Sequence, residues 1–150
     1  MNLLLNSNNA EEEILPAGSV IFKQGERADF AYVIRRGKVS TVVKNEKRIY
    51  PIGIIESDGI TGEDAVFSHS IYKYSAVVLE QVTLVKIPAK DIQQYLSDSP
   101  DWMAILFKEL ATKVQNTIEI ISQNKIQDDT LFGGNEFSEK DERLISKAIS

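Results

Sequence analysis

The sequence predicts a mainly β domain followed by two helices, and two observations support that prediction. From residue 14 to residue 55 the chain is a series of short apolar segments, separated by turn signals about every 8 to 12 residues, which is typical of an antiparallel sandwich or barrel. After Pro88 the apolar period changes to that of a helix. At 150 residues the chain is long enough for one ordinary domain with a core.

The predicted strands are short and occupy the first part of the chain. We expect them at residues 13–15, 20–23, 30–36, 38–44, 48–55 and 82–88. Gly37 is expected to turn the chain between the third and fourth of these strands, because glycine adopts a positive φ without steric cost. Residues 1–12 are rich in Asn and Glu and are expected to form a flexible N-terminal segment.

Two helices are predicted after the last strand. The first is short and covers residues 89–97. The second begins at Ser99-Pro100-Asp101, where Ser can cap the helix, Pro suits the first helical position and Asp favours the positive end of the helix dipole. Neither Gly nor Pro follows until Gly133, so this helix is expected to extend to about Gln127.

A narrow apolar seam runs along this long helix and indicates a homodimer. Its members recur at alternating spacings of four and three residues, namely Met103, Phe107, Leu110, Val114, Thr117 and Ile121. Such a seam is typical of a helix that pairs with another helix. The alternative is that the helix covers only its own β domain. The apolar residues at its start, Trp102, Ile105 and Leu106, are expected to pack on that domain.

The end of the chain is predicted to be a linker followed by a short helix. Residues 128–136 are polar and contain glycine, and residues 138–141 form a start that is similar to a capping box. The helix carries an apolar stripe of Leu144, Ile145, Ala148 and Ile149. Because so short a helix is not stable alone, the stripe either binds a partner protein or folds back onto the chain's own strands.

The segment from Gly62 to Val78 carries the clearest functional pattern. It opens with Gly62-Glu63 and closes with Tyr74-Ser75-Ala76, and a polar turn entered through glycine can direct several backbone N–H groups at an anion. This segment resembles the phosphate-binding cassette of cyclic-nucleotide-binding domains, the β-roll of catabolite-activator-type regulators.

The resemblance extends beyond the cassette. Residues 15–26, 30–39 and 82–88 are similar to the opening, central and last strands of the family, in the same order. The resemblance covers roughly residues 13 to 125, and it implies an antiparallel, jelly-roll-like β-roll followed by a short helix and a long helix. We therefore expect a domain at 13–127 that includes the long helix, and a linker with a short terminal helix at 128–150.

The resemblance also implies roles for individual residues. Glu63 corresponds to the family's ligand for the ribose 2′-hydroxyl, and Ser75 can bond a phosphate oxygen; alternatively, Glu63 accepts backbone N–H bonds and Ser75 only begins a strand. Tyr74 stands where the family has an arginine that neutralises the cyclic phosphate. Loss of that charge-assisted pair costs roughly 1.5–3 kcal/mol, about 10- to 100-fold in affinity. Lys73 could compensate, but neighbouring residues on a strand point to opposite faces.

The complete set of candidate residues and ligands follows from this pattern. The candidate ligand-binding residues are Gly62, Glu63, Asp64, Ala65, Lys73, Tyr74, Ser75, Ala76 and Thr117. Thr117 is included because polar residues of the long helix could contact a base. The possible ligand is cAMP or cGMP, and no other cofactor and no metal is expected.

Composition excludes several other classes of function. A net charge of −5 and the lack of a basic patch argue against nucleic-acid binding. No apolar run approaches the ~18 residues of a membrane span, so a cytoplasmic protein is expected. His69 is the sole histidine, which excludes the metal site of a cupin with the same architecture. No cysteine nucleophile, catalytic triad spacing or P-loop is present, so we do not expect an enzyme.

These observations predict a non-enzymatic regulatory protein. We expect a dimeric sensor or adaptor that acts through contacts with an unidentified protein partner, with weak or absent cyclic nucleotide binding because Tyr74 replaces the arginine. The first alternative is a functional cAMP or cGMP sensor, which the Gly62-Glu63 and Ser75-Ala76 pairs favour. A transcription regulator that lacks its DNA-binding domain is a less favoured alternative, because no recognition helix follows the long helix in this sequence.

Overall fold

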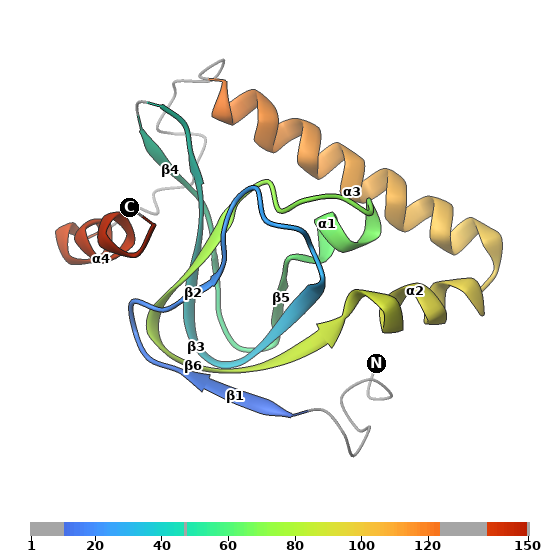
Figure 1. Ribbon diagram of the computed structural model, residues 1–150, viewed down its shortest axis with the longest axis horizontal. Coiled ribbons are helices and arrows are strands. Elements are labelled where there is room, and N and C mark those ends of the chain that lie inside the picture. The colour runs from blue at the N-terminus through green and yellow to red at the C-terminus, as the bar shows by residue number, and fades with distance from the viewer. Residues whose placement is uncertain (1–10, 47, 124–137, 150) are drawn as a thin grey trace.

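The fold is a rolled antiparallel sheet followed by helices, as the sequence predicts. The computed structural model describes residues 11–46, 48–123 and 138–149. The strands of its six-stranded sheet are β1 (Glu12–Leu15), β2 (Val20–Phe22), β3 (Phe30–Lys44), β4 (Ile49–Ile55), β5 (Gly59–Thr61) and β6 (Ser75–Pro88). The helices in the described ranges are α1 (Glu63–Phe67), α2 (Ala89–Ser97), α3 (Asp101–Ser122) and α4 (Glu139–Ile149) (Figure 1).

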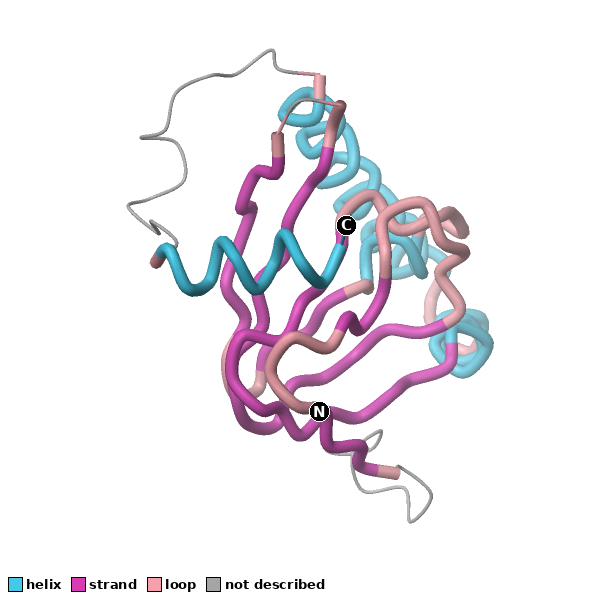
Figure 2. Tube along the Cα trace, turned by 60° about the vertical axis from the view of Figure 1, so that its left-hand side comes forward, coloured by secondary structure: helices cyan, strands magenta, loops and turns pink. Residues whose placement is uncertain are grey.

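Two long strands organise the roll. β3 and β6 pair along almost their whole length, from Phe30 opposite Pro88 to Val42 opposite Ser75. β1 and β2 pair with β6, whereas β4 and β5 pair with β3. Because these short strands join different parts of β3 and β6, the sheet curls over and encloses an interior, while α3 and α4 lie on opposite sides of it (Figures 1 and 2).

The prediction of a turn at Gly37 is wrong, because β3 runs through it as one strand. The pairing of β3 with β6 shifts register between Ile34 and Val39, and Gly37 lies inside this irregular stretch with a φ of 93°. A Cβ atom on Gly37 would collide with the carbonyl oxygen of Gln81 on the paired strand. The glycine therefore allows close approach of β6 and a bend in the strand, instead of ending it.

The predicted end of the flexible N-terminal segment, at residue 12, is also wrong. Glu12 already belongs to β1 and lies opposite Val85 of β6, because its backbone completes the ladder at this edge. Residues 1–10 lie outside the described residues.

The long helix α3 presents a different face to the roll than predicted. Phe107 stacks on Phe67 of α1 with ring centroids 5.0 Å apart, and Ala111 and Ile118 are buried on the same side. Trp102 and Ile105 are 62% and 63% exposed, so they do not pack on the roll as expected, and neither does Leu106, at 45%. The reason is geometric: Ile105 and Phe107 are two residues apart, which places them on roughly opposite sides of a helix with about 3.6 residues per turn.

The predicted seam runs along one edge of the buried side of α3, and its members are covered to different extents. Phe107 and Met103 are half-buried and Ile121 is buried, whereas Leu110 and Val114 are 51% and 48% exposed. The helix ends at Ser122, where the backbone N–H of Gln123 donates to the carbonyl of Glu119. The predicted continuation through 124–127 and the predicted linker at 128–136 lie outside the described residues.

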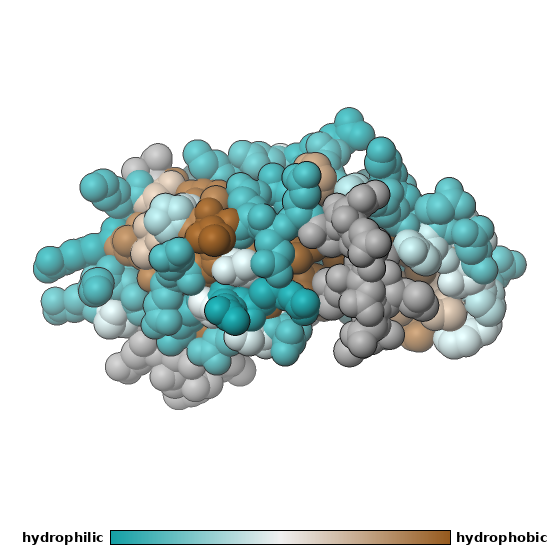
Figure 3. Space-filling view, turned by 90° about the horizontal axis from the view of Figure 1, so that it is seen from below, coloured by the Kyte–Doolittle hydropathy of each residue, from teal (hydrophilic) through white to brown (hydrophobic). Residues whose placement is uncertain are grey.

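The terminal helix α4 packs on the outer face of the roll. Its start is confirmed as a capping interaction, because the Ser138 hydroxyl accepts a bond of 3.1 Å from the backbone N–H of Asp141. Ile145 is 1% exposed and packs with Val42, Val77 and Leu79, and hydrophobic residues gather at this end of the molecule in Figure 3. The apolar stripe of the tail therefore folds back onto the chain's own strands, which was the second of the two alternatives. None of the helices that the structure describes is long and apolar enough to cross a membrane.

Candidate functional site

The cassette connects β5 to β6 and contains a helix that the sequence analysis did not identify. The chain leaves Thr61, passes through Gly62 with a φ of 82° and forms the five-residue helix α1. A Cβ atom on Gly62 would lie only 3.2 Å from the carbonyl oxygen of Phe30 and from the ring of Tyr72, so both backbone angle and space favour glycine here. A helix of five residues is too short to produce a recognisable apolar period.

Tyr74 is inside the roll, and its hydroxyl is fully engaged. The phenol is 6% exposed. Its hydroxyl donates to Asp64 Oδ1 at 2.9 Å and accepts a bond of 3.0 Å from the backbone N–H of Gly62. A third contact at 3.4 Å comes from the hydroxyl of Thr61. Burial, and then the negative charges of Asp64 and Glu63, raise the pKa of Tyr74, so the phenol stays neutral and acts as a donor.

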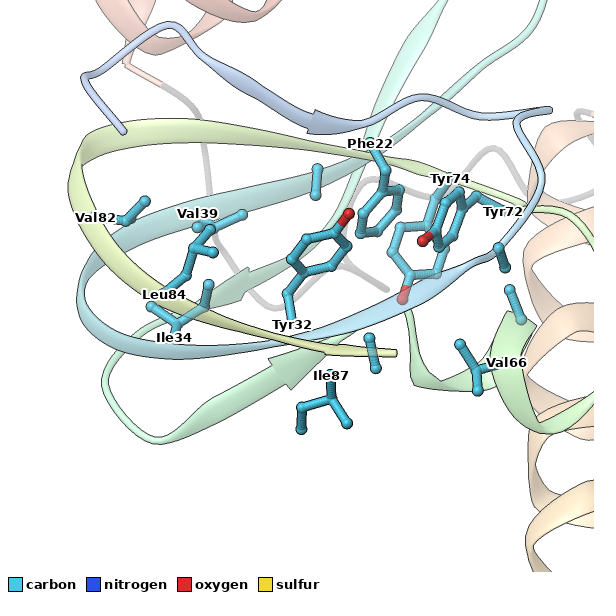
Figure 4. Close-up of a cluster of buried hydrophobic side chains, with 14 of the residues drawn as sticks. Phe22, Tyr32, Ile34, Val39, Val66, Tyr72, Tyr74, Val82, Leu84 and Ile87 are labelled. Atoms are coloured by element: carbon cyan, nitrogen blue, oxygen red, sulfur yellow. The ribbon is translucent and has the colours of Figure 1, made fainter. Parts of the chain in front are cut away.

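Tyr74 belongs to a group of four aromatic rings that fill this part of the interior. The ring of Phe22 lies 5.7 Å from Tyr32, 4.0 Å from Tyr72 and 5.5 Å from Tyr74, measured between centroids. Figure 4 shows these rings between the strands, with Ile34, Val39 and Leu84 at the other end of the same cluster. All four rings are buried. The space inside the roll next to α1 is therefore occupied by side chains.

The other residues at the close of the cassette have packing roles. The Ser75 hydroxyl accepts a bond of 2.9 Å from the backbone N–H of Gln24, and the residue is 4% exposed. Ala65 and Ala76 are fully buried in the core. Lys73 is half-buried and is the single Lys or Arg between residues 62 and 76.

Glu63 is the cassette residue whose carboxyl group is incompletely hydrogen-bonded. Its Oε2 atom is buried and has no hydrogen-bond partner among the described residues. Burial, followed by the neighbouring charge of Asp64, raises the pKa of Glu63 from 4.5 to about 7, although its own backbone N–H opposes the shift. A buried carboxyl that lacks a partner could accept a bond from a ligand hydroxyl, or donate one when it is protonated.

Sequence reasoning missed the role of Gln115 and misplaced Thr117. The Gln115 side-chain amide donates to Asp64 Oδ2 at 3.3 Å and to the Ser70 hydroxyl at 3.0 Å, so it reaches the cassette from α3. Thr117 is exposed, and its hydroxyl donates to the carbonyl of Lys113 on its own helix. The signal for Gln115 was its spacing, because it shares the inward side of the helix with Ala111 and Ile118, at four and three residues.

The arrangement suits a neutral or weakly polar interior better than an anion. Two carboxylates, Glu63 and Asp64, stand in the first turn of α1, and Tyr74 supplies no positive charge. Recognition of a phosphate normally relies on a charge-assisted donor such as the planar fork of arginine. The structure therefore brings the predicted cassette residues Gly62 to Ala65 and Tyr74 to Ala76 together, with a buried phenol and two acids between them.

Two comparisons of the sequence with known proteins gave matches. The family model for the cyclic nucleotide-binding domain matches residues 12–99, which is more than half of the chain. An uncharacterized protein of Haemophilus influenzae is 27% identical over 112 residues, a match that covers 72% of this chain and 86% of that protein.

Solved structures resemble the fold. The cAMP-bound form of the EAL enzyme Bd1971 matches with a TM-score of 0.67 and 22% identity, covering 77% of this chain and 31% of the other. The c-di-GMP-responsive global regulator CLP of Xanthomonas campestris matches with a TM-score of 0.58 and 21% identity, covering 79% of this chain and 61% of the other. The chain thus spans only part of either protein. The family match, the rolled sheet and the cassette between β5 and β6 together show that this chain belongs to the cyclic nucleotide-binding domain family.

Proposed function

We propose that this chain is a non-enzymatic regulatory domain in which Tyr74 occupies the ligand position, so that binding of cAMP or cGMP is weak or absent. The observation that carries the proposal is the pair of bonds at the Tyr74 hydroxyl, which accepts from the Gly62 backbone N–H and donates to Asp64. The bond from Gly62 uses a backbone N–H donor at the opening of the cassette. The domain then acts as a dimeric adaptor or sensor through protein contacts.

The energetic argument has two parts. A phosphate entering the cassette would meet the charges of Glu63 and Asp64 without an arginine to offset them, a deficit of roughly 1.5–3 kcal/mol, or about 10- to 100-fold in affinity. It would also have to displace Tyr74 from a buried position in which its hydroxyl is bonded. Both effects act against the ligand.

Calorimetric titration with cAMP and with cGMP tests the proposal. We expect a dissociation constant weaker than ~10 µM for each nucleotide, given the missing charge-assisted pair. Nanomolar binding of either nucleotide by the wild-type protein would overturn the proposal. In that case Lys73→Ala shows whether the half-buried lysine supplies the missing charge, because its removal should then weaken binding.

One observation favours the alternative, a functional cAMP or cGMP sensor. Glu63 Oε2 is buried without a partner, as a group kept for a ligand hydroxyl would be. Bd1971, which shares the fold, has been solved with cAMP and with cGMP bound. Under this alternative the wild-type protein binds a nucleotide tightly and Glu63→Gln weakens that binding. Under our proposal the substitution leaves an already weak titration unchanged.

We further propose that two copies pair through the exposed edge of the α3 seam. Leu106, Leu110 and Val114 are about half-exposed there, and their spacing of four residues places them along the same edge of the helix. Because the stripe of α4 is packed on the roll, α3 is better supported than the tail as the contact surface.

Light scattering at micromolar concentration tests the assembly. We expect twice the chain mass of 16.8 kDa for the wild type. Leu110→Asp should give a folded monomer, because it places a charge in the apolar seam. Asn116→Asp, which adds the same charge at an exposed position away from the seam, is the matched control and should remain a dimer. A monomeric wild type contradicts the proposal, and so does a dimer that survives Leu110→Asp.

A further inference from the structure

Asp64 is a buried carboxylate that joins three distant parts of the chain. It is 3% exposed, and both of its oxygens accept hydrogen bonds. Tyr74, at the entry to β6, donates to Oδ1 at 2.9 Å, and Gln115 of α3 donates to Oδ2 at 3.3 Å. The same Gln115 amide also donates to the Ser70 hydroxyl at 3.0 Å. The interior of the roll is thereby connected to the long helix through one side chain.

We propose that the Tyr74 phenol is a built-in occupant of the cassette that holds α3 on α1 through Asp64 and Gln115, with no ligand required. The inference rests on the proposed occupation of the roll by Tyr74. It adds to that function a consequence for α3, the helix through which we expect the chain to dimerise.

The chemistry of a buried carboxylate explains why the two ends of this chain of bonds depend on each other. A carboxylate away from water needs donors on its oxygens, and loss of one donor leaves a charge that is poorly compensated. Without the Tyr74 hydroxyl, Oδ1 of Asp64 and the Gly62 backbone N–H would both lack their partner. Asp64 would then turn toward water or other donors, and the bond from Gln115 would be lost with it.

The apolar contact between the helices complements this polar connection. The stacked rings of Phe67 and Phe107 bury area between α1 and α3, and burial of apolar area is non-directional. The bond from Gln115 to Asp64 is directional, so it selects one position of α3 along α1. Tyr74 reinforces that position from inside the roll.

A matched control exists in the same aromatic cluster. Tyr72 is 3% exposed and stacks on Phe22, as a neighbour of Tyr74 in the same group of rings. Its hydroxyl donates to the carbonyl of Phe30 on β3 at 2.6 Å. Among the described residues, no hydrogen bond connects this hydroxyl to α3. Tyr72→Phe and Tyr74→Phe therefore each delete one buried, bonded hydroxyl, and only the second disturbs the connection to α3.

Amide hydrogen exchange on the ligand-free 150-residue chain tests the proposal. Tyr74→Phe should accelerate exchange of the α3 amides by about tenfold relative to those of β3, the factor expected for one charge-assisted hydrogen bond. Tyr72→Phe should leave the ratio between α3 and β3 unchanged. Gln115→Met should reproduce the effect of Tyr74→Phe, and the double variant should exchange no faster than either single variant.

Two results would overturn the proposal. One is an equal effect of Tyr72→Phe and Tyr74→Phe on α3, and the other is a double variant whose effects multiply. If Tyr74→Phe does not fold, Gln115→Met is compared with Thr112→Val, an exposed change on the same helix that lies away from the seam. Equal exchange in these two variants contradicts the proposal. The exchange experiment contains no nucleotide, so its result does not depend on the titration. Tight cAMP binding in the titration would overturn the proposed weak binding without overturning the connection between Tyr74 and α3.

Discussion

The two faces of the rolled sheet bury apolar side chains in different ways. The outer face, beneath α4, is aliphatic and is formed by Val42, Val77, Leu79 and Ile145 with their neighbours. The interior carries tyrosines whose hydroxyls are bonded, and it adjoins the buried carboxylate of Asp64. The outer cluster has the composition of a structural contact. The interior combines bonded polar groups with aromatic side chains that fill the space.

The buried hydroxyls of the two faces also differ, although the buried Oε2 atom of Glu63 beside the interior has no partner among the described residues. Tyr74 and Asp64 in the interior satisfy one another. On the outer side, Ser40 lies opposite Val77 and Ile54, and its hydroxyl has no partner among the described residues. The interior is therefore expected to respond to changes in hydrogen bonding and pH, and the outer face to changes in volume.

The largest effect is expected in the outer cluster. Ile145→Ala should lower the free energy of unfolding by about 3 kcal/mol, because it removes a fully buried aliphatic side chain and leaves a cavity. Denaturant unfolding measures it, with Lys140→Ala, an exposed change on the same helix, as the control. Equal stability of the two variants would mean that α4 does not pack on the roll in solution.

The next effect concerns pH and the interior. The pKa of Glu63 is raised from 4.5 to about 7, so the folded state holds a proton that the unfolded state releases. The stability from this group is fully present below about pH 4.5 and is lost as the pH rises through 7. Glu63→Gln keeps the neutral form, so at pH 8 it should be more stable than wild type by about 1–3 kcal/mol.

The measurement is the free energy of unfolding of both proteins between pH 4 and pH 8. The two profiles should converge near pH 4, where Glu63 is protonated in both states. A constant difference across this range would show that Glu63 titrates normally, and it would remove the argument for a buried, unpartnered carboxyl.

The smallest effect is expected at Ser40. Ser40→Ala removes a buried hydroxyl without a partner, so stability should stay the same or rise by about 0.5–1 kcal/mol. The same kind of deletion at Tyr74, where the hydroxyl is bonded, should instead lower stability. Thermal unfolding of the two variants makes the comparison, and a clear loss of stability in Ser40→Ala would contradict the difference between the two faces.

The sequence was sufficient for the features that depend on local pattern. The short helix at 89–97 and the capping Ser138 follow from period and end signals, and the structure confirms them. The predicted cap of α3 is wrong, because the helix begins at Asp101 after Pro100, and the Ser99 hydroxyl donates to the carbonyl of Tyr95 in the preceding helix instead of capping α3. The roll itself followed from the resemblance of the cassette and the strands around it, and the family match confirms that assignment.

Features that depend on tertiary contact could not be predicted in this way. Gly37 has the local signal of a turn, but its role is close approach to β6, which only the folded sheet reveals. The side of α3 that faces the roll is selected by the position of Phe67, so the apolar start of the helix was a misleading guide. A single Gln115 among apolar positions becomes meaningful only when Asp64 and Ser70 are placed beneath it.

The central claim, that Tyr74 occupies the cassette, can be tested by observing its hydroxyl proton. A hydroxyl that is buried and donates to a carboxylate should exchange slowly enough to give a resolved proton NMR signal. We expect this signal in the wild type and in Tyr72→Phe, and we expect it to be absent in Tyr74→Phe. Addition of cAMP at a few micromolar should leave the signal largely intact, as expected for a dissociation constant weaker than ~10 µM. Loss of the signal with saturation below about 10 µM nucleotide would show that the ligand displaces the phenol and would contradict the account.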